Sequence, residues 1–201
     1  MLLMSLLLSG PSVVAPRVRS VPGYSFSSGV EAIELAESVG LEPDAWQRNA
    51  VMDMLAEDDS GRWAAFEAGL IVARQNGKGA VLEVIDLADL FLFSAGTRDF
   101  LAIHTAHEFK TAQEAFRRVL FWVENNDWLR KKVDRVRTSH GEEGIELLSG
   151  ARLRFLARSG GSGRGFSCDR LTYDEAYDLP DETVAASLPT MSARKNPQVI
   201  Y

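Results

Sequence analysis

The sequence predicts an α/β protein with a central, mostly parallel sheet that is flanked by helices. Short apolar segments typical of buried strands alternate with longer segments of helical periodicity. One helical segment, at 77–93, is apolar nearly all round, and a β-hairpin is expected at 145–156. Because helices cover both faces of a parallel sheet, functional side chains are expected at the carboxyl ends of the strands.

A helical lead-in is expected before the first core strand. Residues 10–30 are rich in glycine, proline and serine, which is typical of extended chain. The amphipathic segment 31–39 predicts a short helix that the following glycine ends, and Pro43-Asp44 predicts the start of a second helix. We therefore expect an N-terminal extension with a short helix over residues 1–40 and one compact domain over residues 41–201.

The core elements follow in alternation along the chain. Each expected strand is a short apolar run, and each expected helix carries apolar residues at helical spacing. The expected strands cover residues 63–72, 100–104, 145–148, 153–156, 171–173 and 199–201, and the expected helices cover residues 77–93 and 108–124.

Composition excludes several classes of protein. Of the 201 residues, 46% are hydrophobic and 25% are charged, which allows a sizeable core and argues against disorder. The net charge of −6 argues against a polybasic nucleic-acid binder. The single cysteine forms no internal disulfide, and because no apolar run reaches the ~18 residues of a membrane span, we expect a soluble protein.

A phosphate-binding loop is predicted at 70–79 (LIVARQNGKG), where a strand turns into the buried helix. Backbone N–H groups and a helix N-terminus favour phosphate oxygens there. Gly77 permits close approach of the backbone, and Lys78 would reach the β- and γ-phosphates. Val72 replaces the first glycine of G-x-x-x-x-G-K-[ST], and Gly79 replaces the hydroxyl residue that ligates Mg²⁺. An ordinary strand–loop–helix junction is the alternative interpretation.

An acidic pair follows another predicted strand. Asp174 and Glu175 come directly after Leu171-Thr172-Tyr173. An aspartate at such a strand end can hold Mg²⁺, and the next glutamate can orient and deprotonate an attacking water. Acidic residues at a helix start are the alternative, but their occurrence together with the Lys78 loop favours a nucleotide site.

Three segments together, ARQNGK (73–78), SGRGF (162–166) and LTYDEA (171–176), resemble the N-terminal ATPase domain of the large subunit of tailed-bacteriophage terminase. The resemblance extends from about residue 43 to residue 201. It implies an ASCE-type P-loop NTPase fold, with ATP and Mg²⁺ as cofactors. It also implies that ATP hydrolysis moves double-stranded DNA into the procapsid.

The resemblance further implies partners and a location. The partners are double-stranded DNA, the small terminase subunit and the portal protein, with self-association into a ring and no membrane. The expected location is the host cytoplasm, at the procapsid portal during packaging. The nuclease domain of the family has no counterpart in this sequence, so no nuclease activity is expected.

Site residues follow from the matching motifs. The resemblance implies that Lys78 neutralises phosphate oxygens, Asp174 holds Mg²⁺ and Glu175 activates water. Gln47, beside Trp46, resembles the glutamine that recognises adenine in such motors, although a surface glutamine beside a core tryptophan is equally compatible. The expected nucleotide-binding residues are Gln47, Arg74, Gln75, Asn76, Gly77, Lys78 and Gly79.

Two arginines are candidates for stabilising charge that develops on the transferred phosphate. Arg74 lies within the phosphate loop and would act on the nucleotide of its own subunit. Arg164 lies in a glycine-flanked loop and resembles the finger that reaches a neighbouring subunit's nucleotide. A surface loop is the alternative for Arg164.

Other clusters point to chemistry less directly. A basic cluster would suit contacts with a phosphate backbone, although a solvated helix end and edge strand would have the same composition. His104 and His107 straddle a strand end and a helix start, which argues against a metal site between them. The basic cluster consists of Arg130, Lys131, Lys132, Arg135 and Arg137.

Two other functions fit parts of this pattern. A non-hydrolysing module that binds DNA or a capsid would explain a degenerate phosphate loop, but it does not explain the retention of Lys78 and Glu175. A DEAD-like helicase is the other alternative, but it requires a G-x-G-K-[ST] loop that residues 72–79 do not provide.

Overall fold

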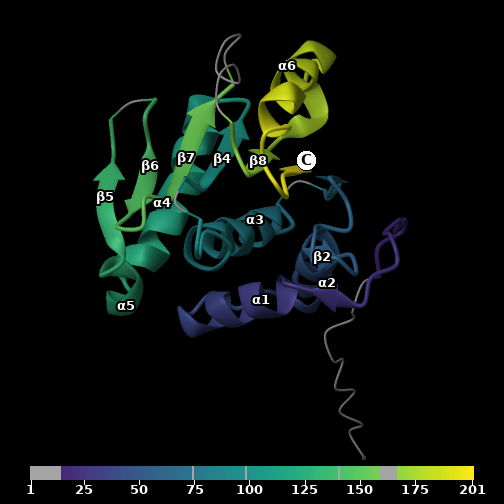
Figure 1. The fold of residues 1–201 in the computed structure, drawn as a ribbon, viewed down its shortest axis with the longest axis horizontal. Helices are drawn as coiled ribbons and strands as arrows, with labels where there is room; N and C mark the ends of the chain where they lie inside the picture. The colour runs from purple at the N-terminus through teal and green to yellow at the C-terminus, as the bar shows by residue number, and fades with distance from the viewer. Residues whose placement is uncertain (1–14, 74, 98, 140, 159–166) are drawn as a thin grey trace, which may run out of the picture.

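The computed structural model describes residues 15–73, 75–97, 99–139, 141–158 and 167–201 (Figure 1). Within these residues the chain forms a seven-stranded sheet of order β3-β9-β8-β4-β7-β6-β5 and a two-stranded sheet of order β1-β2. The strands are β1 (Phe26–Ser27), β2 (Ala56–Glu57), β3 (Glu67–Ala68), β4 (Leu101–Ala106), β5 (Val133–Arg137), β6 (Gly144–Leu147), β7 (Arg152–Ala157), β8 (Arg170–Tyr173) and β9 (Gln198–Ile200).

The helices separate these strands much as the sequence predicts. The first expected helix is α1, and Asp44 is the N-cap of α2. The segment expected as one long buried helix is α3 followed directly by a π-helical turn, η1. The helices are α1 (Gly29–Ser38), α2 (Ala45–Met54), α3 (Lys78–Ala88), η1 (Asp89–Phe93), α4 (Phe109–Glu124), α5 (Asp127–Arg130), η2 (Ala176–Asp178) and α6 (Asp181–Met191).

The large sheet is mostly parallel, which confirms the predicted fold class. Neighbouring strands from β3 to β7 pair in parallel, whereas β6 pairs antiparallel with β7 and β5 pairs antiparallel with β6. The β6–β7 pair is the predicted hairpin. Because β3, β8, β4 and β7 run in the same direction, the segments that follow them all lie at the carboxyl end of the sheet.

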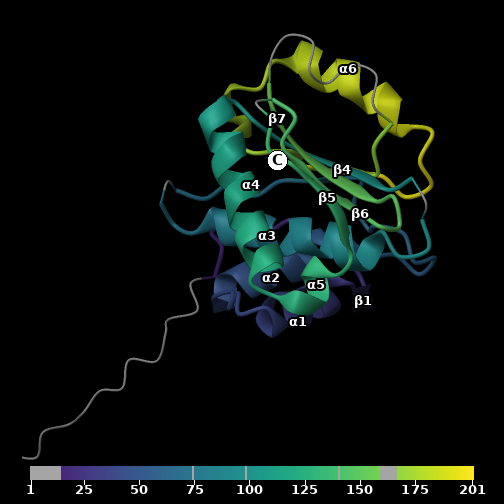
Figure 2. The ribbon, with the colours of Figure 1, turned by 90° about the vertical axis from the view of Figure 1, so that its left-hand side faces the viewer.

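Helices cover both faces of the sheet. Figure 2 shows α6 on one side and α1, α2 and α3 on the other. Along β4, Leu101 and Ile103 pack in the cluster on the α6 side, while Ala102 packs in the larger core with α1 to α4. The helix α1 packs on α3 and α2. A domain boundary at residue 40 stays a prediction.

The first core strand is shorter than the sequence predicts. A strand was expected over 63–72, but β3 contains only Glu67–Ala68, and Ile71 is fully exposed. β3 lies at the sheet edge and pairs with β9 alone among the described residues. The Leu70 N–H still donates to the Tyr201 carbonyl at 2.8 Å, and beyond it the apolar run continues into the loop rather than into the sheet.

Several elements lie outside the expected strands and helices. The helix α6, which contains Pro189, and the short strands β1 and β2 were not expected. The helix α5 and the edge strand β5 correspond to the helix end and edge strand of the alternative interpretation of the basic cluster. The charged residues of β5 interrupt the alternation of apolar and polar residues that is typical of a strand. The proline inside α6 predicts the end of a helix rather than its interior. In the part of the chain that the structure describes, no helix is both long and apolar enough to cross a bilayer.

A buried ion pair fastens the end of α3 to the start of β8. The Arg170 guanidinium lies 3.0 Å from Asp89 Oδ1, and the two side chains are 2% and 0% exposed. Arg170 also donates to the Gln198 amide oxygen and lies 4.6 Å from the centre of the Trp63 ring. Burial raises the pKa of Asp89 to about 7 even though Arg170 opposes the shift.

We expect Arg170→Met to destabilise the fold strongly. The substitution leaves the Asp89 carboxyl buried without its partner, which costs about 3–5 kcal/mol. Urea denaturation measures the loss. The control is Arg62→Ala, which breaks an exposed pair with Asp58 and should cost no more than about 1 kcal/mol. Equal losses in the two variants would contradict a stabilising role for the buried pair.

Candidate functional site

The loop before α3 curls through residues in left-handed backbone conformations. Gln75 has φ 63° and Gly77, the N-cap of α3, has φ 80°. Glycine at 77 suits this conformation, and a Cβ there would stand 2.7 Å from Gln47 Nε2, so any larger residue would displace the Gln47 amide. The predicted phosphate loop therefore has a tight turn whose backbone leads directly into the N-terminus of α3.

Gln47 ties this loop to α2. Its Nε2 donates to the Gly77 carbonyl at 2.9 Å, and its Oε1 accepts from the Asp44 N–H at 2.6 Å as part of a capping box. The side chain is buried, so it is not the surface glutamine of the alternative interpretation. Both polar atoms of the amide are hydrogen-bonded within the chain, and recognition of adenine by Gln47 stays a prediction.

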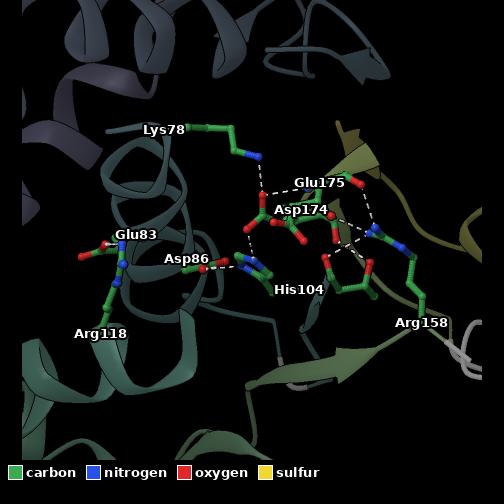
Figure 3. Close-up of polar contacts among 10 residues, drawn as sticks. Lys78, Glu83, Asp86, His104, Arg118, Arg158, Asp174 and Glu175 are labelled. Atoms are coloured by element: carbon green, nitrogen blue, oxygen red, sulfur yellow. Dashed lines mark hydrogen bonds and ion pairs between the residues drawn. The ribbon is translucent and has the colours of Figure 1, made fainter. Parts of the chain in front are cut away.

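Lys78 and Asp174 meet at the carboxyl end of the sheet. Lys78 is the first residue of α3, and Asp174 follows directly after β8. Their side chains form an ion pair from Nζ to Oδ1, with the lysine 31% and the aspartate 14% exposed (Figure 3). The structure thus brings together the two side chains that the sequence motifs place far apart along the chain.

The Asp174 carboxylate is held in its ionised form. Burial opposes ionisation, but the positive groups of His104 and Lys78 outweigh it and place the pKa of Asp174 well below its usual range. Its Oδ1 also accepts from the Glu175 N–H at 2.8 Å. An ionised carboxylate with oxygens that accept from fixed donors is the kind of ligand that Mg²⁺ prefers.

Glu175 takes a left-handed backbone conformation, with φ 56°. Arg158, which follows β7, holds this turn by donating to the Asp174 carbonyl at 2.7 Å and to the Glu175 carbonyl at 2.9 Å. A left-handed glutamate is uncommon and costs energy unless its surroundings enforce it. Arg158 is a site residue that the sequence analysis missed, because no motif marks an arginine after the second hairpin strand.

A buried histidine stands behind the acidic strand end. His104 on β4 is 1% exposed, and its Nδ1 lies 2.8 Å from Asp86 Oδ2 on α3. Its Nε2 lies 4.0 Å from Asp174 Oδ2. Burial opposes protonation, but Asp86 and Asp174 outweigh it and raise the pKa of His104 to about 9. His107, by contrast, is exposed.

The space beside Gly79 opens into a cavity that several charged side chains border. The cavity has a volume of about 280 Å³ and is lined by residues of α3 and α4 together with His104 and Asp174. A Cβ at position 79 would stand 2.7 Å from a terminal nitrogen of Arg118. Arg118 is half exposed and lies 3.5 Å from Glu83 Oε1. Its guanidinium therefore lies close to the space that a serine or threonine side chain would occupy at position 79.

The remaining predicted residues fall into three groups. Gln75 and Asn76 are exposed in the loop, next to Gly77 and Lys78. Arg74 and Arg164 lie outside the described residues, so their roles stay predictions. The basic cluster lies on α5, β5 and the turn between them, at the opposite edge of the sheet from β3. Its Arg137 pairs with Glu146, while the other four residues are exposed.

The fold is a mostly parallel sheet flanked by helices, as in P-loop α/β domains, and comparison with solved structures shows which proteins share it. The sequence matches no protein-family model and no curated protein. The structure, however, is similar to the crystal structure of the HK97 bacteriophage large terminase, with a TM-score of 0.71 and 21% identity. The match covers 87% of this chain and 37% of that one.

Two further structures share the fold. The ATPase domain of the Thermus phage P74-26 large terminase has a TM-score of 0.61 and 19% identity, and the match covers 88% of this chain and 70% of that one. An arginine-to-alanine mutant of the same domain gives the same TM-score and identity, with coverages of 83% and 67%. The chain therefore has the fold of phage large terminase ATPase domains, as the motif resemblance led us to expect.

We expect Gln47→Ala to loosen the loop before α3. Both Gln47→Ala and Asp44→Ala weaken the cap of α2, by about 0.5–2 kcal/mol, but only Gln47→Ala removes the side-chain donor to the Gly77 carbonyl and leaves it with the Ala80 N–H alone. Hydrogen–deuterium exchange of the loop amides should therefore rise more in Gln47→Ala than in Asp44→Ala. Equal exchange in the two variants would show that the Gln47 contact does not order the loop.

Proposed function

We propose that this chain is the ATPase domain of a viral DNA-packaging motor of the terminase large-subunit type. Its role would be to hydrolyse ATP with Mg²⁺ in order to move double-stranded DNA into a procapsid. The observation that carries the proposal is the convergence of Lys78, Asp174 and Glu175 at one end of the sheet. The similarity in fold to phage large terminases supports it.

Lys78 and the loop would hold the phosphates. The N-terminus of α3 and the backbone N–H groups of 75–79 favour phosphate oxygens, and the Lys78 ammonium adds a positive charge. Phosphate oxygens compete with the Asp174 carboxylate for this ammonium. Nucleotide binding would therefore move Lys78 from Asp174 to the β- and γ-phosphates and leave Asp174 Oδ1 available.

Asp174 would hold Mg²⁺. The residues fit this role, because the carboxylate is ionised and borders a cavity that is large enough for water. Bound there, Mg²⁺ would supply electrostatic stabilisation of the charge on the phosphate oxygens. Gly79 provides no hydroxyl ligand, so oxygens of the phosphates and water would complete the coordination.

Glu175 would accept the proton of the attacking water. Its backbone is fixed on one side by its N–H bond to Asp174 Oδ1 and on the other by Arg158. This turn separates the tasks of two neighbouring carboxylates: Asp174 is paired with Lys78, and Glu175 is partly exposed beside the same site. Retention of both groups favours hydrolysis over a module with a degenerate phosphate loop.

Arg74 and Arg164 would stabilise the developing charge, Arg74 in its own subunit and Arg164 in the site of a neighbour in a ring. The exposed residues of the basic cluster would contact the DNA backbone. The small terminase subunit and the portal protein would be the other partners, in the host cytoplasm at the procapsid portal. The match spans 37% of the HK97 large terminase. The partners and the location are therefore proposed for the whole motor rather than for this domain alone.

We expect Glu175→Gln to lower Mg²⁺-dependent ATP hydrolysis by about 100-fold or more, because loss of a general base typically has an effect of this size. Binding of a fluorescent ATP analogue should persist in this variant, whereas Lys78→Ala should lose it. Phosphate release and fluorescence titration measure the two properties at concentrations that allow self-association. Glu182→Gln, at an exposed acid on α6, is the control and should match the wild type. Equal rates for Glu175→Gln and wild type would overturn the proposed role.

A further inference from the structure

The polar side chains behind the acidic strand end form a continuous buried chain. Asp86 on α3 contacts His104 on β4, and His104 faces Asp174 after β8 (Figure 3). Asp86 is 2% exposed and His104 is 1% exposed. Burying a polar group costs free energy unless it is hydrogen-bonded. The presence of Asp86 and His104 in the core therefore calls for an explanation beyond packing.

The His104 ring is fixed in orientation. Its Nδ1 is 2.8 Å from Asp86 Oδ2, and its ring lies against Phe155 with centres 5.2 Å apart. The central position of β4, with β7 on one side and β8 on the other, holds its backbone. The direction in which Nε2 points is therefore set by α3 and by the sheet.

The second ring nitrogen is directed at the site. Among the described residues, Nε2 is a buried side-chain nitrogen without a hydrogen-bond partner. It lies 4.0 Å from Asp174 Oδ2, and both residues line the cavity beside Gly79. The two oxygens of Asp174 thus have different neighbours, because Oδ1 accepts from Lys78 and from the Glu175 N–H while Oδ2 faces His104.

We propose that His104 is a positioning residue that orients the Asp174 carboxylate for Mg²⁺, with Asp86 fixing the imidazole from behind. This inference rests on the proposed function. When phosphate oxygens draw Lys78 away from Asp174, the Glu175 N–H and His104 remain to stop the carboxylate from rotating. A carboxylate that is already oriented binds a cation more tightly, since less freedom is lost on binding. Partners behind metal ligands typically change metal affinity by about 10–100-fold.

Two substitutions distinguish the contact of His104 Nδ1 with Asp86 from the approach of Nε2 to Asp174. An asparagine amide reaches about as far as Nδ1, so His104→Asn keeps the contact with Asp86 and loses the one toward Asp174. A glutamine amide reaches about as far as Nε2, so His104→Gln restores a donor toward Asp174. His107→Asn is the matched control, because His107 is exposed at the end of the same strand.

The experiment measures binding of a fluorescent ATP analogue to the whole chain, first in EDTA and then as Mg²⁺ is added. For His104→Asn we expect the Mg²⁺ concentration at half-maximal effect to rise about 10-fold or more, with binding in EDTA unchanged. His104→Gln should lie closer to the wild type, and His107→Asn should match it. A thermal melt shows whether each variant folds.

The other outcomes contradict either the positioning role of His104 or the proposed function. If His104→Asn keeps the wild-type Mg²⁺ midpoint, or weakens binding equally with and without Mg²⁺, the positioning role is wrong while the proposed function stands. If the wild type binds no nucleotide, the proposed function fails and this inference fails with it. Should His104→Asn not fold, Asp86→Asn serves instead, and an unchanged Mg²⁺ midpoint in that variant overturns the inference.

Discussion

The position of α3 against β8 is the constraint on which the rest of the site depends. Two ion pairs hold these elements together, one at each end: Lys78 with Asp174 at the carboxyl end of the sheet, and Asp89 with Arg170 at the opposite end. The buried pair sets where α3 lies along the strand. The pair of Lys78 and Asp174 is partly exposed and lies where a ligand could compete for it. The same alignment therefore holds α3 firmly at one end and leaves the candidate site accessible at the other.

Contacts from other elements extend this alignment to the whole site. Gln47 on α2 holds the loop at Gly77, and Arg158 after β7 holds the turn at Glu175. Each donates from its side chain to backbone carbonyls, which holds the loop and the turn in place without using the Lys78 or Asp174 side chains. The basic cluster lies at the other edge of the sheet, so the proposed nucleotide site and the proposed DNA-contacting surface use different charged residues.

The sequence predicted those parts whose signal is local. Apolar runs and helical spacing identify most of the strands and helices, and the motifs around Lys78 and Asp174 identify the end of the sheet where the candidate site lies. The exposure of Ile71 was not predictable, because it depends on where β9 stops pairing with β3. Nor were Arg158 and the Asp86–His104 contact, because they join residues from different elements whose spacing in the sequence carries no periodic or motif signal.

A structure of the chain with Mg²⁺ and a non-hydrolysable ATP analogue tests the central claim most directly. The account predicts the triphosphate at the N-terminus of α3, with Lys78 Nζ on β- or γ-phosphate oxygens and the Asp174 carboxylate on the side of the cation. A nucleotide bound elsewhere, with the ion pair between Lys78 and Asp174 still closed, would contradict it.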